Sequence, residues 1–287
     1  MSSIAIVGPG AIGSVIAAML HTHGHEVPLC ARRPIGVLQV QTDRGEVRWT
    51  PKVALDPSAV EPADWVLVCT KTYDANSAAT WLPGLCRNGA RVAVLQNGVE
   101  HRTRFAGVVP DTHLVPVMVD LPAERGDASV RQRGPAKMSV SDDVLGRGFA
   151  TLFAGTSVNV TLTDDLTTAL WRKLCINAVG VISGIIDRPA GVMQRPEAQQ
   201  LGRKIIEEVV AVGRAEGAKL DANVIDAVLA GCRNAPPDGI NSLHADRRAG
   251  RQTEIDARNG VIVRLGAKHG IPTPYNAMAV ALVSLCR

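Results

Sequence analysis

The sequence predicts an α/β fold in which a doubly wound, mostly parallel sheet is followed by an all-helical domain. Short apolar runs alternate with helical patterns through the first half of the chain, and a glycine-rich turn follows the first run. Strand patterns nearly disappear after Asp164. Runs that are apolar at successive residues are typical of strands buried on both faces of a parallel sheet. We therefore expect two domains, residues 1–163 and residues 164–287.

Five apolar runs predict the strands of the first domain, at residues 4–7, 26–29, 65–69, 91–95 and 114–119. Residues 12–23 have the pattern of a small-residue helix that ends before Gly24, a residue type common just after helices. A strand, a tight turn, a helix and a second strand form a βαβ unit. Residues 130–160 are more polar, which favours antiparallel edge strands, and the alternating run at 156–161 is expected to end the sheet.

The second domain is predicted to be helical at residues 166–186, 196–216, 222–232, 253–269 and 277–286. The stretches PPDG and PTP mark loops within it. Because an α/β domain is followed by an all-helical domain, the cleft between the two domains is the expected place for a ligand.

The composition is that of a globular protein, with 46% hydrophobic and 20% charged residues, which excludes disorder for the whole chain. A net charge of +4 without basic runs, and only 3% aromatic residues, argue against a nucleic-acid partner. No unbroken apolar stretch is long enough for a membrane span, and the N-terminus lacks the pattern of a signal peptide, so we expect a cytoplasmic protein. The six cysteines lack metal-ligand spacing, so we expect reduced, packed thiols and no metal site.

The turn after the first strand has the spacing of a dinucleotide-binding loop, GxGxxG, formed by Gly8, Pro9, Gly10, Ala11, Ile12 and Gly13. In such a loop the first glycine allows the tight turn and the second lets a pyrophosphate approach the backbone. The third lets the helix pack closely on the strand, and the anion then lies against free N–H groups at the helix N-terminus. The position of this motif in a βαβ unit predicts a Rossmann-type domain.

The end of the second strand distinguishes between the two nicotinamide dinucleotides. An NAD site has a carboxylate there to accept a hydrogen bond from the ribose 2′-hydroxyl. This chain has Arg32 and Arg33 instead, and a guanidinium pairs well with a 2′-phosphate. We therefore expect NADP(H), with Arg32 as the main contact and Arg33 as an accessory; the alternative is a solvated arginine pair.

Polar side chains also follow two later strands. Lys71 comes after the run 65–69 and Asn97 after the run 91–95. In open α/β sheets the ligand crevice lies outside the carboxyl ends of the strands, so both residues are expected to face the cofactor groove.

In the helical domain, Lys173 and Asn177 are four residues apart and share one face of a helix that we expect to be buried nearly all round. A desolvated lysine releases its proton readily, which suits a proton donor; the alternative is a lysine that extends to the surface. Ser242 and Glu254 are further candidates, although Glu254 also fits an ordinary acid in the first turn of a helix.

Together these segments resemble the ketopantoate reductase (2-dehydropantoate 2-reductase) family over essentially the whole chain. The matching pieces are GPGAIG, Arg32, CTKTYD, LQNGV, LWRKLCIN, INSLHAD, QTEID and HGIPTP. The resemblance implies a Rossmann domain followed by a helical domain. It also implies NADPH-dependent reduction of 2-dehydropantoate to (R)-pantoate, a step of pantothenate biosynthesis.

The resemblance assigns roles to residues of both domains. Residues 8–13 hold the pyrophosphate of NADP and Arg32 its 2′-phosphate, while Lys71 and Asn97 line the cofactor groove. Lys173 is the proton donor, Glu254 anchors cofactor and substrate beside it, and Asn97, Asn177 and Ser242 bind the substrate.

Two asparagines of the family pattern are missing. One would stand at Gly180 or Val181 and the other near Ala190 or Gly191, and Asp187 or Arg188 is a candidate replacement. Two lost hydrogen-bond donors would weaken substrate binding about tenfold or more. A different 2-oxo acid substrate and a β-hydroxyacid dehydrogenase therefore remain as alternatives. A non-enzymatic NADP-binding protein is a third alternative, and the presence of Lys173, Asn177, Ser242 and Glu254 argues against it. The sequence leaves open whether the chain forms a homodimer.

Overall fold

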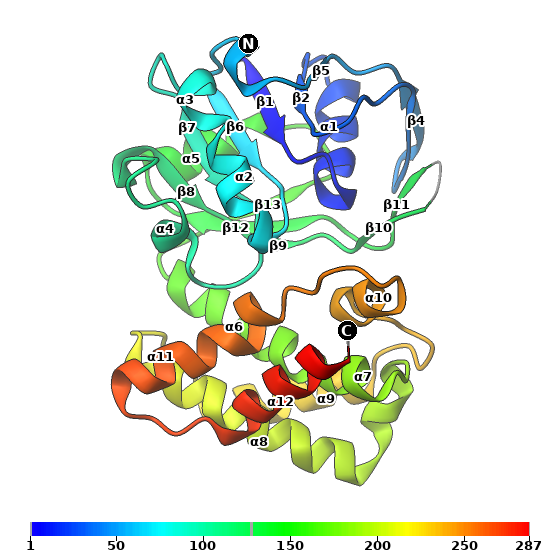
Figure 1. The fold of residues 1–287 in the computed structure, drawn as a ribbon, viewed down its shortest axis with the longest axis vertical. Coiled ribbons are helices and arrows are strands. Elements are labelled where there is room, and N and C mark those ends of the chain that lie inside the picture. The colour runs from blue at the N-terminus through cyan, green and yellow to red at the C-terminus, as the bar shows by residue number, and fades with distance from the viewer. Residues whose placement is uncertain (1, 127–128, 287) are drawn as a thin grey trace. The chain divides into compact units, whose positions relative to one another are not determined.

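The computed structural model describes residues 2–126 and 129–286, and the chain divides into two compact units, Met1–Leu166 and Thr167–Arg287 (Figure 1). The first unit is built around a sheet and the second from helices. The predicted α/β class is confirmed.

A six-stranded sheet in the order β5-β2-β1-β6-β7-β8 forms the centre of the first unit, and all its neighbouring strands are parallel. The second strand is shorter than predicted, and the run 114–119 is divided between two sheets. The strands are β1 (Ile4–Val7), β2 (Leu29–Cys30), β5 (Val53–Ala54), β6 (Trp65–Val68), β7 (Arg91–Val94) and β8 (Leu114–Pro116).

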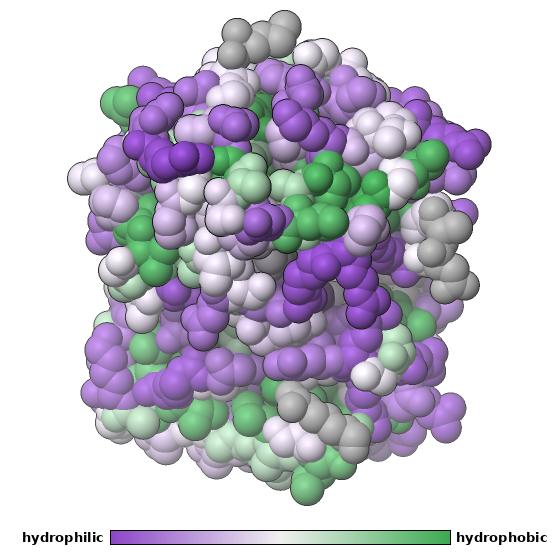
Figure 2. Space-filling view, turned by 45° about the horizontal axis from the view of Figure 1, so that its top comes forward, coloured by the Kyte–Doolittle hydropathy of each residue, from purple (hydrophilic) through white to green (hydrophobic). Residues whose placement is uncertain are grey.

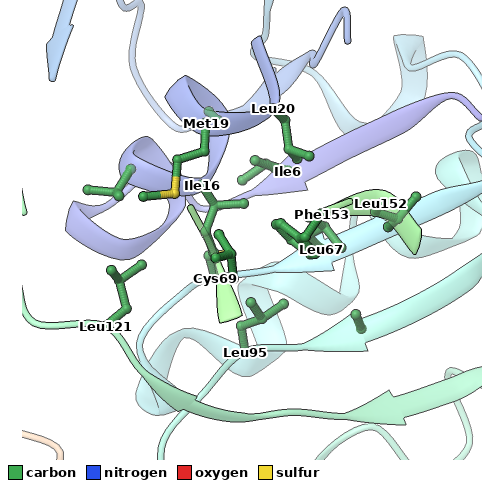
Figure 3. Close-up of a cluster of buried hydrophobic side chains, with 14 of the residues drawn as sticks. Ile6, Ile16, Met19, Leu20, Leu67, Cys69, Leu95, Leu121, Leu152 and Phe153 are labelled. Carbon is green, nitrogen blue, oxygen red and sulfur yellow. The ribbon is translucent and has the colours of Figure 1, made fainter. Parts of the chain in front are cut away.

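Both faces of this sheet are covered, because successive residues of each buried strand point to opposite sides. Ile4 and Ile6 pack with helix α1 (Ala11–Thr22) and helix α5 (Val144–Leu152). Figure 3 shows Ile6 of β1 close to Ile16 and Leu20 of α1. Ala5 and Val7 pack on the other face, against the layer formed by α2 (Ala75–Ala79), α3 (Leu82–Leu85) and α4 (His101–Arg104).

The chain order of the strands creates a switch point at β1. The chain adds β2 and β5 on one side of β1 and then returns to the other side with β6. Ligands of doubly wound sheets bind beyond the carboxyl ends of the strands at such a point. This edge therefore carries the loops that follow Val7 and Val68.

Two smaller sheets complete the first unit, in the orders β10-β11-β3-β4 and β13-β12-β9. Their strands are β3 (Leu38–Thr42), β4 (Gly45–Trp49), β9 (Met118–Asp120), β10 (Ala123–Arg125), β11 (Val130–Gln132), β12 (Lys137–Ser141) and β13 (Asn159–Thr163). Short 3-10 turns lie at η1 (Pro57–Ala59), η2 (Thr72–Asp74) and η3 (Asp111–His113).

Antiparallel edge strands are expected at residues 130–160, and this expectation is wrong for the pair formed by β12 and β13. β12 and β13 are parallel, and α5 is the crossover between them; β13 belongs to a separate sheet and does not end the large one. Alternation of polar and apolar residues indicates a half-exposed strand, but it does not determine the direction of the partner strand.

The second unit consists of helices α6 (Leu166–Val179, which begins at the end of the first unit), α7 (Val181–Ile186), α8 (Pro196–Ala215), α9 (Val224–Arg233), α10 (Ser242–Arg248), α11 (Val261–His269) and α12 (Pro274–Leu285), with a 3-10 turn η4 (Ala190–Gln194) and a π-helical turn η5 (Asp256–Gly260). The predicted helix 166–186 is interrupted at Gly180, and the predicted helix 253–269 begins with the π-helical turn. Helix α10 was not predicted, because a helix of seven residues shows too little periodicity in the sequence.

The stretch Leu166–Ile186 is the one part of the described chain long and apolar enough to span a membrane. Half of its most apolar window is buried within the structure, as in the core helix of a folded unit, so this is weak support for a membrane span. On the face shown in Figure 2, hydrophobic side chains form separate patches among hydrophilic ones.

Candidate functional site

The glycine-rich turn after β1 is shaped by two close approaches. Gly8 has φ +86, and a Cβ there would lie 2.9 Å from the backbone nitrogen of Thr70, in the loop after β6. A Cβ at Gly13 would lie 2.6 Å from the carbonyl oxygen of Gly8 and 3.1 Å from Cβ of Cys69. Side chains are therefore excluded at both positions, and α1 begins directly beside the strand ends.

Gly10 differs from the other two glycines, because it has an ordinary negative φ of −71 and a Cβ there would meet no atom within 4 Å. It is the N-cap of α1, it has no side chain to cap the helix, and the first turn contains no acidic residue. The N-terminus of a helix attracts anions through its free N–H groups and its dipole. The space over Gly10 and the lack of a competing carboxylate suit a bound phosphate group.

Arg32 lies just after β2 at the same edge of the sheet. Its side chain is 74% exposed and pairs with Asp74, with an Nη1 to Oδ1 distance of 3.2 Å. Arg33 is exposed as well. The ion pair with Asp74 was not predicted, because the two residues are 42 positions apart in the chain.

Lys71 and Asn97 follow β6 and β7, whose carboxyl ends are neighbours. The buried Gln96 connects the two loops: its Nε2 donates to Oγ1 of Thr70 at 2.8 Å and to the carbonyl of Lys71 at 3.3 Å. Nη1 of Arg104 donates to Oε1 of the same side chain at 3.0 Å. Sequence reasoning missed Gln96, although its place beside Asn97 at a strand end was a usable signal.

Helix α6 of the second unit carries Lys173 and Asn177 one turn apart. The expectation that this helix is buried nearly all round is wrong, because Arg172 and Ile176 are exposed. Its buried face consists of Trp171, Leu174, Cys175, Ala178 and Val179. The exposed face was not predicted from the sequence, because Ile176 is apolar and nevertheless lies on the exposed side of the helix.

The end of α6 is capped by side chains from two distant segments. Nε and Nη2 of Arg258 donate to the carbonyl of Asn177, the former at 3.0 Å, and Nδ2 of Asn259 donates to the carbonyl of Ala178 at 3.2 Å. Nδ2 of Asn241 donates to the carbonyl of Gly180 at 2.9 Å. Helix ends leave carbonyls without partners, so these bonds stabilise the interruption between α6 and α7.

Ser242 and Glu254 lie on the segments that make these bonds. Ser242 is exposed and begins α10, whose N-cap Asn241 accepts from the backbone N–H of His244 at 3.1 Å. Glu254 is 5% exposed and precedes the π-helical turn, so it does not lie in the first turn of a helix, as the alternative expected.

Burial lowers the pKa of Arg258 to about 10, while the negative charges of Glu254 and Asp246 act in the opposite direction. The negative charge of Glu254 thus acts on the guanidinium that contacts Asn177. The second unit brings Asn177, Ser242 and Glu254 to one region, with Lys173 one turn away. The glycine turn, Arg32, Lys71 and Asn97 form a separate group in the first unit.

Both halves of the chain match models of one family. Residues 4–143 match the ketopantoate reductase PanE/ApbA model, and residues 165–286 match the model of its C-terminal domain. The chain belongs to the ketopantoate reductase family.

Full-length relatives agree with this assignment. A 2-dehydropantoate 2-reductase of Caulobacter vibrioides is 48% identical over 288 residues, with 99% of each chain covered. One from Mycobacterium tuberculosis is 37% identical, covering 99% of this chain and 97% of the relative.

Solved structures share the fold. The PanE/ApbA family ketopantoate reductase of Ralstonia eutropha JMP134 has a TM-score of 0.90 and 35% identity, with 99% and 98% of the two chains covered. A ternary complex of D-mandelate dehydrogenase with NADH and anilino(oxo)acetate has a TM-score of 0.89 and 25% identity, covering 99% of this chain and 97% of the other. The family fold thus also occurs in an enzyme whose name indicates another hydroxy acid.

The positions of the two missing asparagines have other occupants in this member of the family. Next to Gly180 lie Arg258 and Asn241, and the backbone N–H of Gly191 donates to the carbonyl of Pro237 at 2.8 Å. Asp187 does not replace an asparagine donor, since its carboxylate accepts from Arg248 at 2.6 Å and from His244 at 2.7 Å. The hydrogen bonds from Arg248 and His244 lower the pKa of Asp187 to about 2.

The buried cysteines are not candidates for chemistry in either of the two residue groups. Burial raises the pKa of the Cys30, Cys69 and Cys175 thiols to about 12, so these groups stay protonated and unreactive. In residues 2–126 and 129–286, histidine, cysteine, aspartate and glutamate side chains form no group of three or more that could hold a metal ion.

Proposed function

We propose that this chain reduces 2-dehydropantoate to (R)-pantoate with NADPH, as the names of its full-length relatives indicate. The observation that carries the proposal is the match of both halves of the chain to one reductase family. The two residue groups described above support it, because one suits a dinucleotide and the other a small polar substrate.

The glycine turn fits the pyrophosphate of NADP(H), because Gly10 leaves the N-terminus of α1 open and uncapped. Arg32 is the partner for the 2′-phosphate, with Arg33 beside it, and binding exchanges the exposed pair with Asp74 for a bidentate contact with phosphate. Lys71 and Asn97 line the groove, held in place by Gln96. When bound, NADPH supplies the hydride.

The residues of the second unit act on the substrate. Lys173 donates a proton to the carbonyl oxygen as that oxygen gains negative charge, a contribution of about 10²–10⁴-fold. Asn177 and Ser242 donate hydrogen bonds that orient the oxo acid, and Glu254 anchors substrate and cofactor beside Lys173.

The function is tested by measuring NADPH oxidation with 2-dehydropantoate and with a panel of other 2-oxo acids. We expect the highest kcat/KM for 2-dehydropantoate. The variant K173A is expected to bind NADPH as the parent does and to turn over about 10²–10⁴-fold more slowly. Full activity of K173A would show that another group donates the proton.

A second candidate, reduction of a different 2-oxo acid, is favoured by two observations. A structural relative with the same fold is a D-mandelate dehydrogenase, and this chain has Gly180 and Val181 where an asparagine of the family pattern is expected. A clear preference in the panel for an aromatic or a smaller oxo acid would replace 2-dehydropantoate as the substrate, while leaving the hydride chemistry unchanged.

A further inference from the structure

A cavity of about 300 Å³ lies in the first unit, at the edge of the large sheet where its strands begin. Trp65, the first residue of β6, and Arg91, the first residue of β7, both line the cavity and are paired in the register of the two strands. Each strand has four residues, so this edge lies about 10 Å from the strand ends that carry Lys71 and Asn97. The cavity is therefore separate from the candidate coenzyme site.

Part of the cavity lining is apolar. Trp65 is 2% exposed and Leu152 of α5 is 6% exposed, and both belong to the buried cluster in which Figure 3 labels Leu152. Gly148, one turn before Leu152, lines the cavity as well, and a Cβ there would lie 3.2 Å from Cζ2 of Trp65. The lack of a side chain at Gly148 thus leaves room beside the indole, where an apolar group of a ligand could be buried.

Arg91 adds a cation to this lining. Its Cζ lies 5.5 Å from the centre of the Trp65 ring, within the range of a cation–π contact. With residues 2–126 and 129–286, the guanidinium forms neither a hydrogen bond nor an ion pair. A guanidinium that rests with one face on an aromatic ring keeps the N–H donors at its edge available, and these donors match the two oxygens of a carboxylate or phosphate group.

The nearby carboxylate of Asp64 does not occupy these donors. Its Oδ2 accepts from the backbone N–H of Ser3 at 2.8 Å and from the hydroxyl of Ser3 at 3.0 Å. These hydrogen bonds are the main reason why the pKa of Asp64 is lowered, and the positive charge of Arg91 makes a smaller contribution. The residues that line the cavity include no acid, so a ligand anion would meet no carboxylate within the lining.

Two further polar side chains line the same cavity, those of His25 and Ser2. His25 is half-buried, and within the described part of the chain neither its ring nor the Ser2 hydroxyl has a hydrogen-bond partner. The hydroxyl of Thr151, in contrast, is used within its own helix, where it donates to two backbone carbonyls. His25 and Ser2 thus add two hydrogen-bonding groups to a lining whose only charged side chain is Arg91.

We propose that this cavity binds a small organic anion, with Arg91 as the partner of its carboxylate or phosphate group and with Trp65 and Leu152 against its apolar part. The volume of about 300 Å³ is at the lower end of the range for small-molecule pockets. The proposal does not depend on the proposed function, because the cavity shares no residue with the candidate coenzyme and substrate groups.

Calorimetric titration of the parent protein and of R91Q with benzoate, phenyl phosphate and neutral benzamide tests the site. NADP⁺ and oxamate, an unreactive analogue of a 2-oxo acid, are present in excess to keep the probes out of the candidate coenzyme and substrate sites. The parent should bind at least one of the two anions, and R91Q should bind it about 10–100-fold more weakly, the range for a lost hydrogen bond to a charged group. Tighter binding of benzoate indicates a carboxylate ligand, and tighter binding of phenyl phosphate indicates a phosphate.

Three results would overturn the proposal. They are equal anion binding by the parent and R91Q, binding of benzamide as tight as that of the better anion, and no binding of either anion by the parent. R91Q should retain the NADPH affinity of the parent, because Arg91 belongs to neither candidate residue group. A failure of the proposed function therefore leaves this comparison intact.

Two control variants separate the site from a general effect of charge. R131Q removes an exposed arginine of β11 that does not line the cavity, so it should bind the anions as the parent does. G148A leaves every charge in place and adds a methyl group beside Trp65, so it should weaken the binding of both anions. A loss in R131Q as large as that in R91Q, or binding by G148A equal to that of the parent, would place the probes outside the cavity. The unfolding temperature of each variant is measured to show that it is folded.

Discussion

At the scale of single residues, glycine is needed at the three positions of the first turn for different physical reasons. Gly8 combines a positive φ with the backbone of Thr70 at close range, and Gly13 abuts the carbonyl of Gly8. Gly10 has neither constraint, and what the missing side chain provides is open space over the N-terminus of α1. The motif therefore mixes residues needed for folding with one needed for binding.

A matched pair of variants distinguishes these reasons. G8A should destabilise the protein by about 1–3 kcal/mol, because alanine is strained at φ +86 and also meets the loop after β6. G10A should unfold at the parent temperature but bind NADPH at least about tenfold more weakly, since its methyl group occupies the space of a phosphate. Thermal unfolding and NADPH titration measure both effects. Tight NADPH binding by G10A would argue against the loop as the pyrophosphate site.

The coenzyme preference depends on Arg32. R32A should lose about 10–100-fold in affinity for NADPH and little for NADH, because only NADPH carries the 2′-phosphate. D74N removes the competing carboxylate and should leave NADPH affinity equal or higher. Titration of both variants with both coenzymes checks this, and a parallel loss for NADPH and NADH in R32A would contradict the assignment.

At the scale of elements, the loop after β7 is fixed by a buried histidine. Nε2 of His101, the first residue of α4, lies 2.9 Å from the carbonyl of Gln96, the residue whose side chain joins the loops after β6 and β7. Burial, with a smaller contribution from the positive charge of Arg104, lowers the pKa of His101 from 6.5 to about 4. The neutral histidine is therefore part of the folded arrangement.

The pH dependence of stability follows from that shift. The unfolded chain takes up a proton below pH 6.5, whereas folded His101 resists protonation until about pH 4. The stability from neutral His101 is present above pH 6.5, and the free energy of unfolding should fall by roughly 1.4 kcal/mol per pH unit within that window. Denaturant unfolding of the parent and of H101Q between pH 7 and 4 measures it. An equal slope in both proteins would contradict this origin.

The sequence predicted the fully buried strands and the first helix best. The buried strands β1, β6 and β7 follow from unbroken apolar runs, and α1 follows from its small residues and Gly24. The direction of β13 and the π-helical turn at Asp256 were not predictable, since both depend on partners distant in the chain.

The same limit applies to the candidate site. Gly8, Lys71 and Asn97 could be proposed from the sequence because strand ends mark them, and their roles stay predictions. Gln96 and Arg258 were missed because their importance depends on contacts with Thr70 and Asn177, many residues away.

At the scale of the whole molecule, the two compact units are predicted to bind different ligands. The first unit is expected to bind the dinucleotide and the second to bind the oxo acid. Neither the predicted cleft between the domains nor the possible homodimer is tested by the structure, and both stay predictions. The binding roles of the two units are open to direct measurement.

Hydrogen exchange locates each ligand. NADPH alone should slow amide exchange chiefly in the loops after β1, β2 and β6 of the first unit, where backbone N–H groups meet phosphate. Addition of oxamate to the NADP⁺ complex should extend protection to the end of α6 and the π-helical turn. Protection by NADPH confined to the second unit would reverse the assignment of the units.

The buried thiols have a practical consequence for such experiments. Alkylating reagents react with thiolates, and burial raises the pKa of the Cys30, Cys69, Cys86, Cys175 and Cys232 thiols, which suppresses thiolate formation there. Cys286, just after α12, is only partly buried. A maleimide fluorophore should therefore attach there first, which would give a singly labelled enzyme for fluorescence work without removing any native cysteine.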